Sequence, residues 1–160
     1  MYRTLFILAI IFLVSCKPAS YYIVRHAEKA SETMASDVPL SDAGKRRAEA
    51  LREVLKNEKI SQIYSTNYLR TKGTAQPLSD ATGTGITVYD SRDTSFVNRL
   101  KKEGKGGILI VGHSNTVDDL VNGFMGQDLL TDLADNRYGD LFVIRKKGKK
   151  FSFEQKRFGQ

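Results

Sequence analysis

The chain has 160 residues, of which 41% are hydrophobic and 27% are charged. This length is enough for one globular domain with a sizeable core, and it leaves no room for a second domain. The composition excludes a disordered chain, and the single cysteine excludes a disulfide scaffold. The formal net charge of +7 favours an anionic substrate, an acidic surface or nucleic acid as a partner, without choosing among them.

The first 15 residues are predicted to be a signal peptide. Arg3 precedes an apolar run from residue 5 to residue 14, which is about half of the ~20 residues that a membrane-spanning helix needs. Leu13-Val14-Ser15-Cys16 resembles a bacterial lipobox, whose cysteine is lipidated and becomes the new N-terminus. Alternatively, Cys16 is an ordinary free thiol, but its position directly after the apolar run would then be a coincidence.

We therefore expect three parts: residues 1–15 as a lipoprotein signal peptide, residues 16–20 as the lipidated N-terminus and tether, and residues 21–160 as the folded domain. Acyl chains on Cys16 would anchor the protein to a membrane of the bacterial cell envelope, outside the cytoplasm, without spanning it.

Apolar runs alternate with amphipathic stretches along the domain. The predicted strands are residues 21–24, 60–64, 86–89 and 108–111. The predicted helices are residues 41–57, with Ser41 as N-cap, 67–80, 95–103 and 116–125. Gly73 and Pro77 argue against regularity in the second helix, and the continuous apolar run at 108–111 predicts a central strand covered on both faces.

A hairpin is predicted at the end of the chain, with strands at 141–146 and 150–156 around Gly148. The basic run at 145–150 would be its solvated turn, and no basic stripe with interleaved aromatic residues indicates nucleic-acid binding. The whole pattern predicts an α/β fold with a mostly parallel central sheet, helices on both faces and an antiparallel C-terminal edge hairpin.

The chain has two histidines, and each follows a predicted strand. His26 ends the segment Tyr-Tyr-Ile-Val-Arg-His, and His113 ends Ile-Leu-Ile-Val-Gly-His. Ligands of open parallel sheets bind in the crevice beyond the carboxyl ends of the strands, so neighbouring strands would bring both imidazoles to one cleft. Either histidine alone could be an ordinary strand-end residue, but chance is a poor explanation for both.

These residue types suit phosphoryl transfer, which needs a nucleophile, fixed positive charge and a proton source. A neutral His26 imidazole can attack phosphorus if a backbone carbonyl holds the proton of its other ring nitrogen. Arg25 and a second arginine can pair with phosphate oxygens bidentately. His113, if protonated, would add a further donor.

Four segments resemble, in order, the motifs of the histidine phosphatase (phosphoglycerate-mutase-like) superfamily. They are Arg25-His26-Ala27-Glu28, Leu40 to Gly44 with Arg47-Ala48, Tyr64 to Ala75, and Val111-Gly112-His113-Ser114-Asn115. The resemblance implies a phosphatase that forms phosphohistidine on His26. It also implies that Arg25, Arg70 and His113 surround the phosphate, with Asn115 near it through its backbone.

Departures from the family pattern concern the proton donor. Ser114 stands where the acid-phosphatase branch has an acidic donor, which argues against that branch. In the mutase branch the acid follows the third strand, so Asp90 or Asp93 is the candidate, although either could be a turn or cap residue. Glu28 is a third candidate, or it orients its neighbours. Lys29, in place of a small hydroxyl residue, either adds charge beside the substrate or is a solvated loop lysine.

Two other functions remain open. A mutase would need a second phosphate pocket and a cap against water, and residues 90–107 contain no insertion for a cap. A non-catalytic, lipid-anchored domain could use the same pocket to bind an anionic group. Neither a metal nor another cofactor is expected, because no His/Cys cluster remains, although a carboxylate-only Mg²⁺ site stays possible.

The expected partners are a membrane and a phosphorylated small molecule, protein or envelope glycan. Nucleic acid is not expected, and the oligomeric state is left open.

Overall fold

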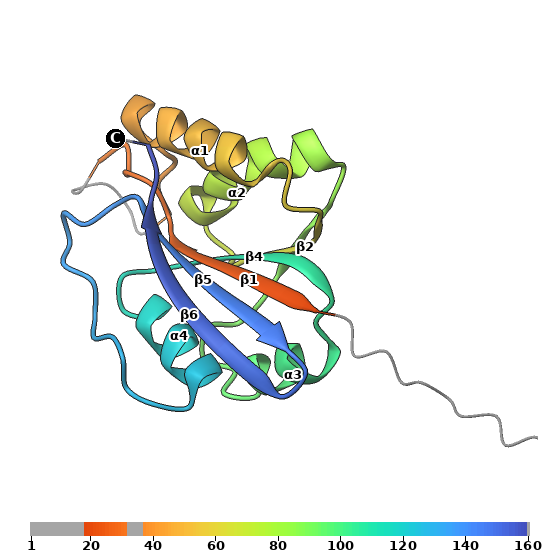
Figure 1. The fold of residues 1–160 in the computed structure, drawn as a ribbon. Helices are drawn as coiled ribbons and strands as arrows, with labels where there is room; N and C mark the ends of the chain where they lie inside the picture. The colour runs from red at the N-terminus through yellow and green to blue at the C-terminus, as the bar shows by residue number, and fades with distance from the viewer. Residues whose placement is uncertain (1–17, 32–36, 160) are drawn as a thin grey trace, which may run out of the picture.

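A computed structural model describes residues 18–31 and 37–159 (Figure 1). The predicted signal peptide and Cys16 lie outside the described residues. The elements are β1 (Ala19–Arg25), α1 (Asp42–Leu55), β2 (Ile60–Ser65), α2 (Leu69–Thr82), β3 (Ile86–Val88), α3 (Phe96–Glu103), β4 (Gly106–Gly112), α4 (Val117–Met125), β5 (Asp140–Lys147) and β6 (Lys150–Arg157).

The strands form one sheet in the order β3-β2-β4-β1-β5-β6. The pairs β2–β3, β2–β4 and β1–β4 are parallel, whereas β5 pairs antiparallel with both β1 and β6. The predicted α/β class, with its parallel sheet and C-terminal edge hairpin, is confirmed.

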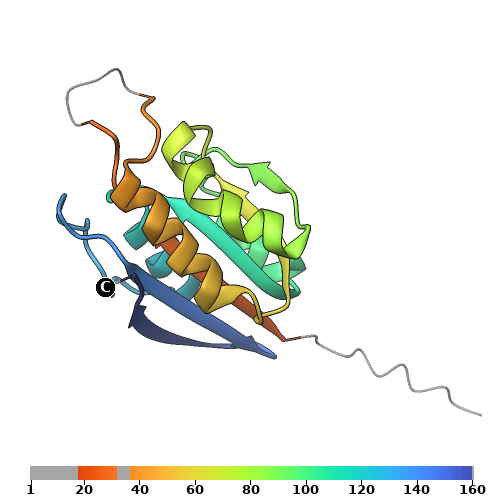
Figure 2. The ribbon, with the colours of Figure 1, turned by 90° about the horizontal axis from the view of Figure 1, so that it is seen from above.

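Helices cover both faces of the sheet because side chains on one strand alternate between faces. Tyr22 and Val24 of β1 pack with residues of α1 and α2, including Leu51 and Leu78. Tyr21 and the intervening Ile23 pack with α3 and α4 on the opposite face. Figure 2 shows α1 and α2 side by side over one face, and Figure 1 shows α3 and α4 below the other.

Helix α2 is continuous, contrary to the expected irregularity at Gly73 and Pro77. Its buried residues Ala75 and Leu78 belong to the core, and tertiary packing of this kind outweighs the local cost of proline. Gly73 has a packing role, since a Cβ atom there would lie 3.3 Å from the Leu40 side chain.

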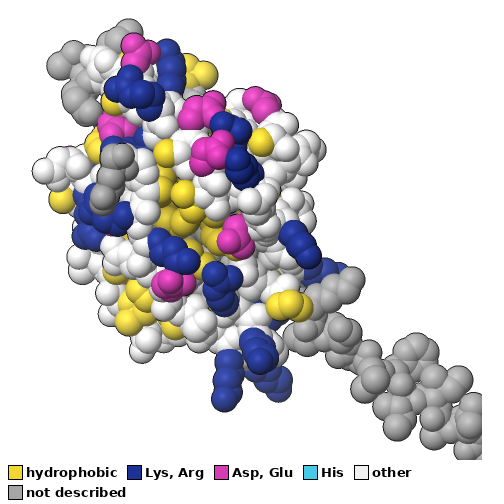
Figure 3. Space-filling view, turned by 45° about the horizontal axis from the view of Figure 1, so that its top comes forward, with side chains coloured by type: hydrophobic (Ala, Val, Ile, Leu, Met, Phe, Trp, Pro, Cys, Tyr) yellow, Lys and Arg dark blue, Asp and Glu magenta, His cyan; other side chains and the backbone are white. Residues whose placement is uncertain are grey.

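Basic and acidic side chains are interspersed over much of the face in Figure 3. No helix among the described residues has the length and apolar character needed to span a membrane.

Candidate active site

The register between β1 and β4 brings the two histidines together. Arg25 pairs with Gly112, and the backbone N–H of His26 donates to the Gly112 carbonyl over 2.9 Å. The rings of His26 and His113 are consequently 5.5 Å apart between centroids. The predicted meeting of both imidazoles beyond the strand ends is present in the structure.

His26 is oriented as a nucleophile. Its Nδ1 lies 2.8 Å from the carbonyl oxygen of Ala27, so Nδ1 carries the proton and Nε2 presents a lone pair. The side chain is buried, and burial, followed by the charge of Arg25, lowers its pKa to about 3. The imidazole is therefore neutral at pH 7, as nucleophilic attack requires.

His113 is held by groups from β2 and α2. Its Nε2 is 2.9 Å from the hydroxyl of Thr66, which in turn donates to Thr71 over 3.0 Å. The Arg70 guanidinium approaches Nδ1 at 3.5 Å, so Nδ1 acts as the acceptor and Nε2 as the donor. Burial, and then Arg70 and Arg25, lower the pKa of His113 to about 4.

The His113 ring is therefore neutral at pH 7 when the pocket holds no anion, contrary to the expectation that it is protonated. Two guanidinium groups and a partly buried ring disfavour the imidazolium form. A bound phosphate would oppose this effect, because nearby negative charge raises the pKa of an imidazole.

Arg25 anchors the loop between α4 and β5 while leaving one donor available. Its Nη1 donates to the carbonyl oxygens of Ala134 and Asp135 at 3.0 and 2.9 Å. Its guanidinium also lies 4.4 Å from the ring centroid of Tyr138. The buried Nε of Arg25 has no hydrogen-bond partner among the described residues. An anion in the pocket would satisfy such a donor.

These groups line a cavity of about 360 Å³. Its lining residues are Arg25, His26, Lys29, Tyr68, Arg70, Ser91, His113, Ser114, Asn115, Thr116 and Asp135. The structure thus brings together six of the predicted site residues. Lys29 is part of the wall, and its backbone forms an antiparallel bridge with Leu40.

Glu28 is directed to a different partner. Its carboxylate accepts bonds of 2.7 to 3.0 Å from Arg47. Burial raises the Glu28 pKa, but the bonds from Arg47 outweigh this effect and leave the pKa below its usual value. Arg47 also donates to the carbonyl oxygens of Phe158 and Gly159. Glu28 therefore orients its neighbours and does not face the phosphate pocket.

The carboxylates after β3 are also outside the wall of this cavity. Asp90 accepts two bonds of 3.1 Å from Arg92, which lower its pKa. Asp93 accepts bonds from Ser95 and Arg99, which lower its pKa to about 2. Both carboxylates are stabilised in the ionised form, whereas a leaving-group acid must carry a proton.

The one carboxylate in the cavity lining is Asp135, which the sequence did not single out. It lies in a polar loop that also contains Asp128 and Asp132, and nothing local distinguishes the three. Tyr68 was missed for a similar reason. Its ring packs against the Arg70 guanidinium at 4.3 Å and the His113 ring at 5.1 Å.

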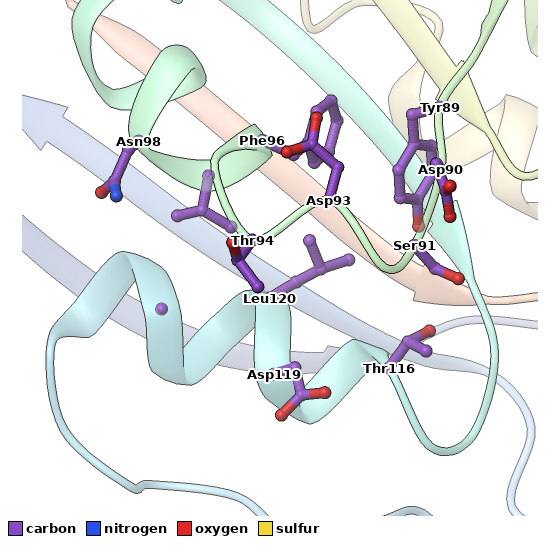
Figure 4. Close-up of a pocket in the computed structure, with 12 residues that line it drawn as sticks. Tyr89, Asp90, Ser91, Asp93, Thr94, Phe96, Asn98, Thr116, Asp119 and Leu120 are labelled. Atoms are coloured by element: carbon purple, nitrogen blue, oxygen red, sulfur yellow. The ribbon is translucent and has the colours of Figure 1, made fainter.

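A second cavity of about 480 Å³ adjoins the first and shares Ser91 and Thr116 with it. Figure 4 shows it between the segment after β3 and helix α4. Phe96 and Leu120 supply apolar surface, and Asp119 is one of its polar residues. No Lys or Arg belongs to its lining among the residues described.

No group of three or more His, Cys, Asp or Glu side chains placed to hold a metal occurs within residues 18–31 and 37–159. Positive charge in the pocket comes from Arg25, Arg70 and Lys29.

The sheet order, with helices on both faces and two histidines at the ends of β1 and β4, is that of the phosphoglycerate-mutase-like α/β proteins. A family model, "Histidine phosphatase superfamily (branch 1)", matches residues 21–91. This match covers less than half of the chain, and over these residues the chain resembles the histidine phosphatase superfamily.

Solved structures with this fold include proteins named as phosphatases. A putative phosphohistidine phosphatase SixA from Agrobacterium tumefaciens is 21% identical, with a TM-score of 0.63 over 87% of this chain and 96% of that one. A mycobacterial glucosyl-3-phosphoglycerate phosphatase is 14% identical, with a TM-score of 0.68 over 89% and 99%. A phosphoserine phosphatase from Entamoeba histolytica is 12% identical, with a TM-score of 0.66 over 89% and 97%. No curated protein matches the sequence.

Proposed function

We propose that the protein is a metal-independent phosphatase that hydrolyses phosphomonoesters, or related phosphorylated substrates, through a phosphohistidine intermediate on His26. The observation that carries this proposal is the orientation of His26. The carbonyl of Ala27 holds the Nδ1 proton, so the neutral ring presents Nε2 to the pocket that Arg25 and Arg70 share.

In the first step, Nε2 of His26 attacks phosphorus and the phosphorus–oxygen ester bond breaks. Arg25 and Arg70 stabilise the charge on the phosphoryl oxygens, which is the main contribution a protein makes to such a transition state. The leaving oxygen takes a proton from an acid or from water. Asp135 is our candidate for this acid, because it is the acidic residue among those that line the same cavity.

In the second step, water attacks phosphorus and the nitrogen–phosphorus bond breaks. Inorganic phosphate is released, His26 returns to its neutral form, and the proton lost by water restores the acid.

The adjoining cavity favours a phosphatase over a mutase. A phosphoglycerate-type mutase must hold a second anionic group. A further cavity that shares Tyr68 and Ser91 with the pocket has Arg92 as the one basic residue of its described lining, and Arg92 is paired with Asp90. The second cavity is lined by Asp90, Asp93 and Asp119 and by no basic residue within the described chain. Its apolar surface would instead accept a neutral and bulky leaving group. We therefore propose a phosphorylated small molecule, protein or envelope glycan as substrate.

We further propose that acyl chains on Cys16 tether this catalytic domain to a membrane of the bacterial cell envelope. The lipobox-like sequence before Cys16 supports this proposal.

Trapping the intermediate tests the catalytic proposal directly. The wild-type protein, mixed with a radiolabelled aryl phosphate and quenched within milliseconds, should retain acid-labile, alkali-stable label. His26→Ala should retain none and lose at least ~10³-fold in turnover, because no other group provides the nucleophile. Tight phosphate binding without turnover in the wild type would favour the non-catalytic alternative. Transfer of label to a second phosphate acceptor would favour the mutase.

A chelator should leave turnover unchanged, and vanadate should inhibit it competitively. Arginine and lysine side chains supply the positive charge in the proposed mechanism, and vanadate mimics the five-coordinate phosphoryl group. Activity that disappears with chelator and returns with Mg²⁺ or Zn²⁺ would contradict the metal-independent mechanism.

A further inference from the structure

Four segments, residues 18–20, 58–61, 101–107 and 145–151, form what we call the basic end. The net positive charge of the protein is concentrated in two of them, 101–107 and 145–151, and the other two are neutral overall. Together the four segments contain nine of the 25 Lys and Arg residues but two of the 18 Asp and Glu residues. The rest of the chain is therefore balanced, and the whole excess of +7 belongs to the basic end.

The four segments meet at one end of the sheet. Ala19, the first residue of β1, pairs with Gly106 on one side and Lys146 on the other. The N–H of Gly106 donates to the Pro18 carbonyl, and the N–H of Gly107 donates to the Lys59 carbonyl, both over 3.3 Å. The Nζ of Lys146 donates to the carbonyl of Lys101.

The lysines of this end are mostly exposed, and Lys147 and Lys150 also line an apolar hollow. Lys59, Lys102, Lys105, Lys147, Lys149 and Lys150 are exposed. A hollow of about 770 Å³ lies between the start of β1 and the β5–β6 hairpin, where Pro18, Ala19 and Phe151 form part of its lining. The start of β1 and the hairpin turn lie together in Figures 1 and 2.

We propose that the basic end is a docking surface for an anionic phospholipid membrane. The occupant is indicated by charge and by the position of the N-terminus. Basic residues near an anionic leaflet each contribute about 1 kcal/mol to binding. The apolar run at residues 5–14 and Cys16 lie immediately before Pro18 in the sequence, so any N-terminal membrane attachment enters the fold at this end.

Docking through the basic end would orient the catalytic pocket away from the membrane. Strand β1 begins at the basic end with Ala19 and ends at Arg25, and it is seven residues long. At ~3.3 Å per residue, the strand separates the two ends by about 20 Å. The membrane would therefore contact one end of the parallel strands, while His26 and His113 face the aqueous side at the other.

Vesicle binding tests this surface. The full-length protein is sedimented with vesicles of phosphatidylcholine containing a third phosphatidylglycerol, and with vesicles of phosphatidylcholine alone. The ratio of the two affinities cancels the contribution of the apolar N-terminal run, which both vesicles share. Wild type should prefer the anionic vesicles at least ~100-fold, and added salt should reduce the preference.

The variant Lys147→Gln/Lys149→Gln/Lys150→Gln should lose this preference, with anionic-vesicle affinity falling about 100-fold. The matched control, Lys45→Gln/Arg46→Gln/Lys156→Gln, removes three exposed charges outside the basic end and should change affinity less than ~3-fold. Far-ultraviolet circular dichroism checks that both variants remain folded.

Three outcomes would overturn the proposal: equal wild-type binding to both vesicles, equal losses in the two variants, or tighter binding to duplex DNA than to anionic vesicles. The last would identify nucleic acid as the partner. None of these readouts uses phosphatase activity, so the docking surface and the catalytic proposal fail independently.

Discussion

The two neutral histidines make the folded protein sensitive to mild acid. Burial lowers the pKa of His26 to about 3 and that of His113 to about 4, against an unfolded value of 6.5. When folding lowers the pKa of a histidine, the free energy of unfolding falls as the pH drops below the unfolded pKa, because the unfolded chain then binds a proton that the folded protein does not. The loss should develop below pH 6.5 and continue until the folded rings titrate.

The expected magnitude follows from these values. Between pH 6.5 and pH 5.0, protonation of each unfolded histidine lowers the free energy of unfolding by roughly 1–2 kcal/mol, so the pair costs about 3 kcal/mol. This is a large share of the ~5–15 kcal/mol that stabilises a typical domain. Urea unfolding at the two pH values measures it.

The variant His26→Asn/His113→Asn provides the comparison, because it keeps every carboxylate that titrates in the same range. Between pH 6.5 and pH 5.0, its free energy of unfolding should fall by about 3 kcal/mol less than that of wild type. Proton NMR gives a second readout, since the chain has two histidines and each ring should titrate well below 6. Equal losses in the two proteins, or a ring signal titrating between pH 6 and 7, would refute the reasoning.

The remaining predictions concern the leaving-group acid, the membrane anchor and a close backbone approach. Loss of the acid should slow the hydrolysis of an alkyl phosphate about 100-fold more than that of an aryl phosphate, because an aryl leaving oxygen hardly needs a proton. Because Asp135 lines the cavity and Asp90 does not, we expect this result for Asp135→Asn and not for Asp90→Asn, with Asp128→Asn as the charge-matched control. Small losses of equal size for the two substrates in Asp135→Asn and in Asp90→Asn would indicate that water supplies the proton. Cys16→Ser should release the protein from the membrane fraction, because acyl chains would be its anchor; a wild-type mass without acyl chains would contradict this. Gly44→Ala should lower the free energy of unfolding by about 1–3 kcal/mol in a urea titration, since its Cβ would lie 2.3 Å from the Glu28 carbonyl oxygen; an unchanged midpoint would show that the Glu28 backbone moves freely.

Much of the fold follows from local pattern in the sequence. Strand and helix signals depend on neighbouring residues, as in the apolar run at 108–111 that became part of β4. Helix α2 was predicted to exist, but its continuity through Gly73 and Pro77 was not. Proline and glycine penalise a helix locally, and the gain from packing Ala75 and Leu78 into the core is invisible until the tertiary structure exists.

The sequence by itself determined which chemistry the pocket could hold. His26 and His113 each follow a predicted strand, and parallel strands end at the same edge of a sheet, so their meeting could be predicted before any coordinates. Arg25 is tied to that edge by its place beside His26, and Arg70 was identified through the motif around it.

Only the tertiary structure decided what surrounds those residues. Asp135 is 109 residues from His26 along the chain, and loop residues carry no periodic signal that would place one aspartate of three in the cavity. The paired partners of Glu28 and Asp90 are likewise set by how α1 and the loop after β3 pack. Charge shows both effects. The basic run at 145–150 is visible in the sequence, but only strand register places residues 101–107 and Lys59 at the same end of the sheet.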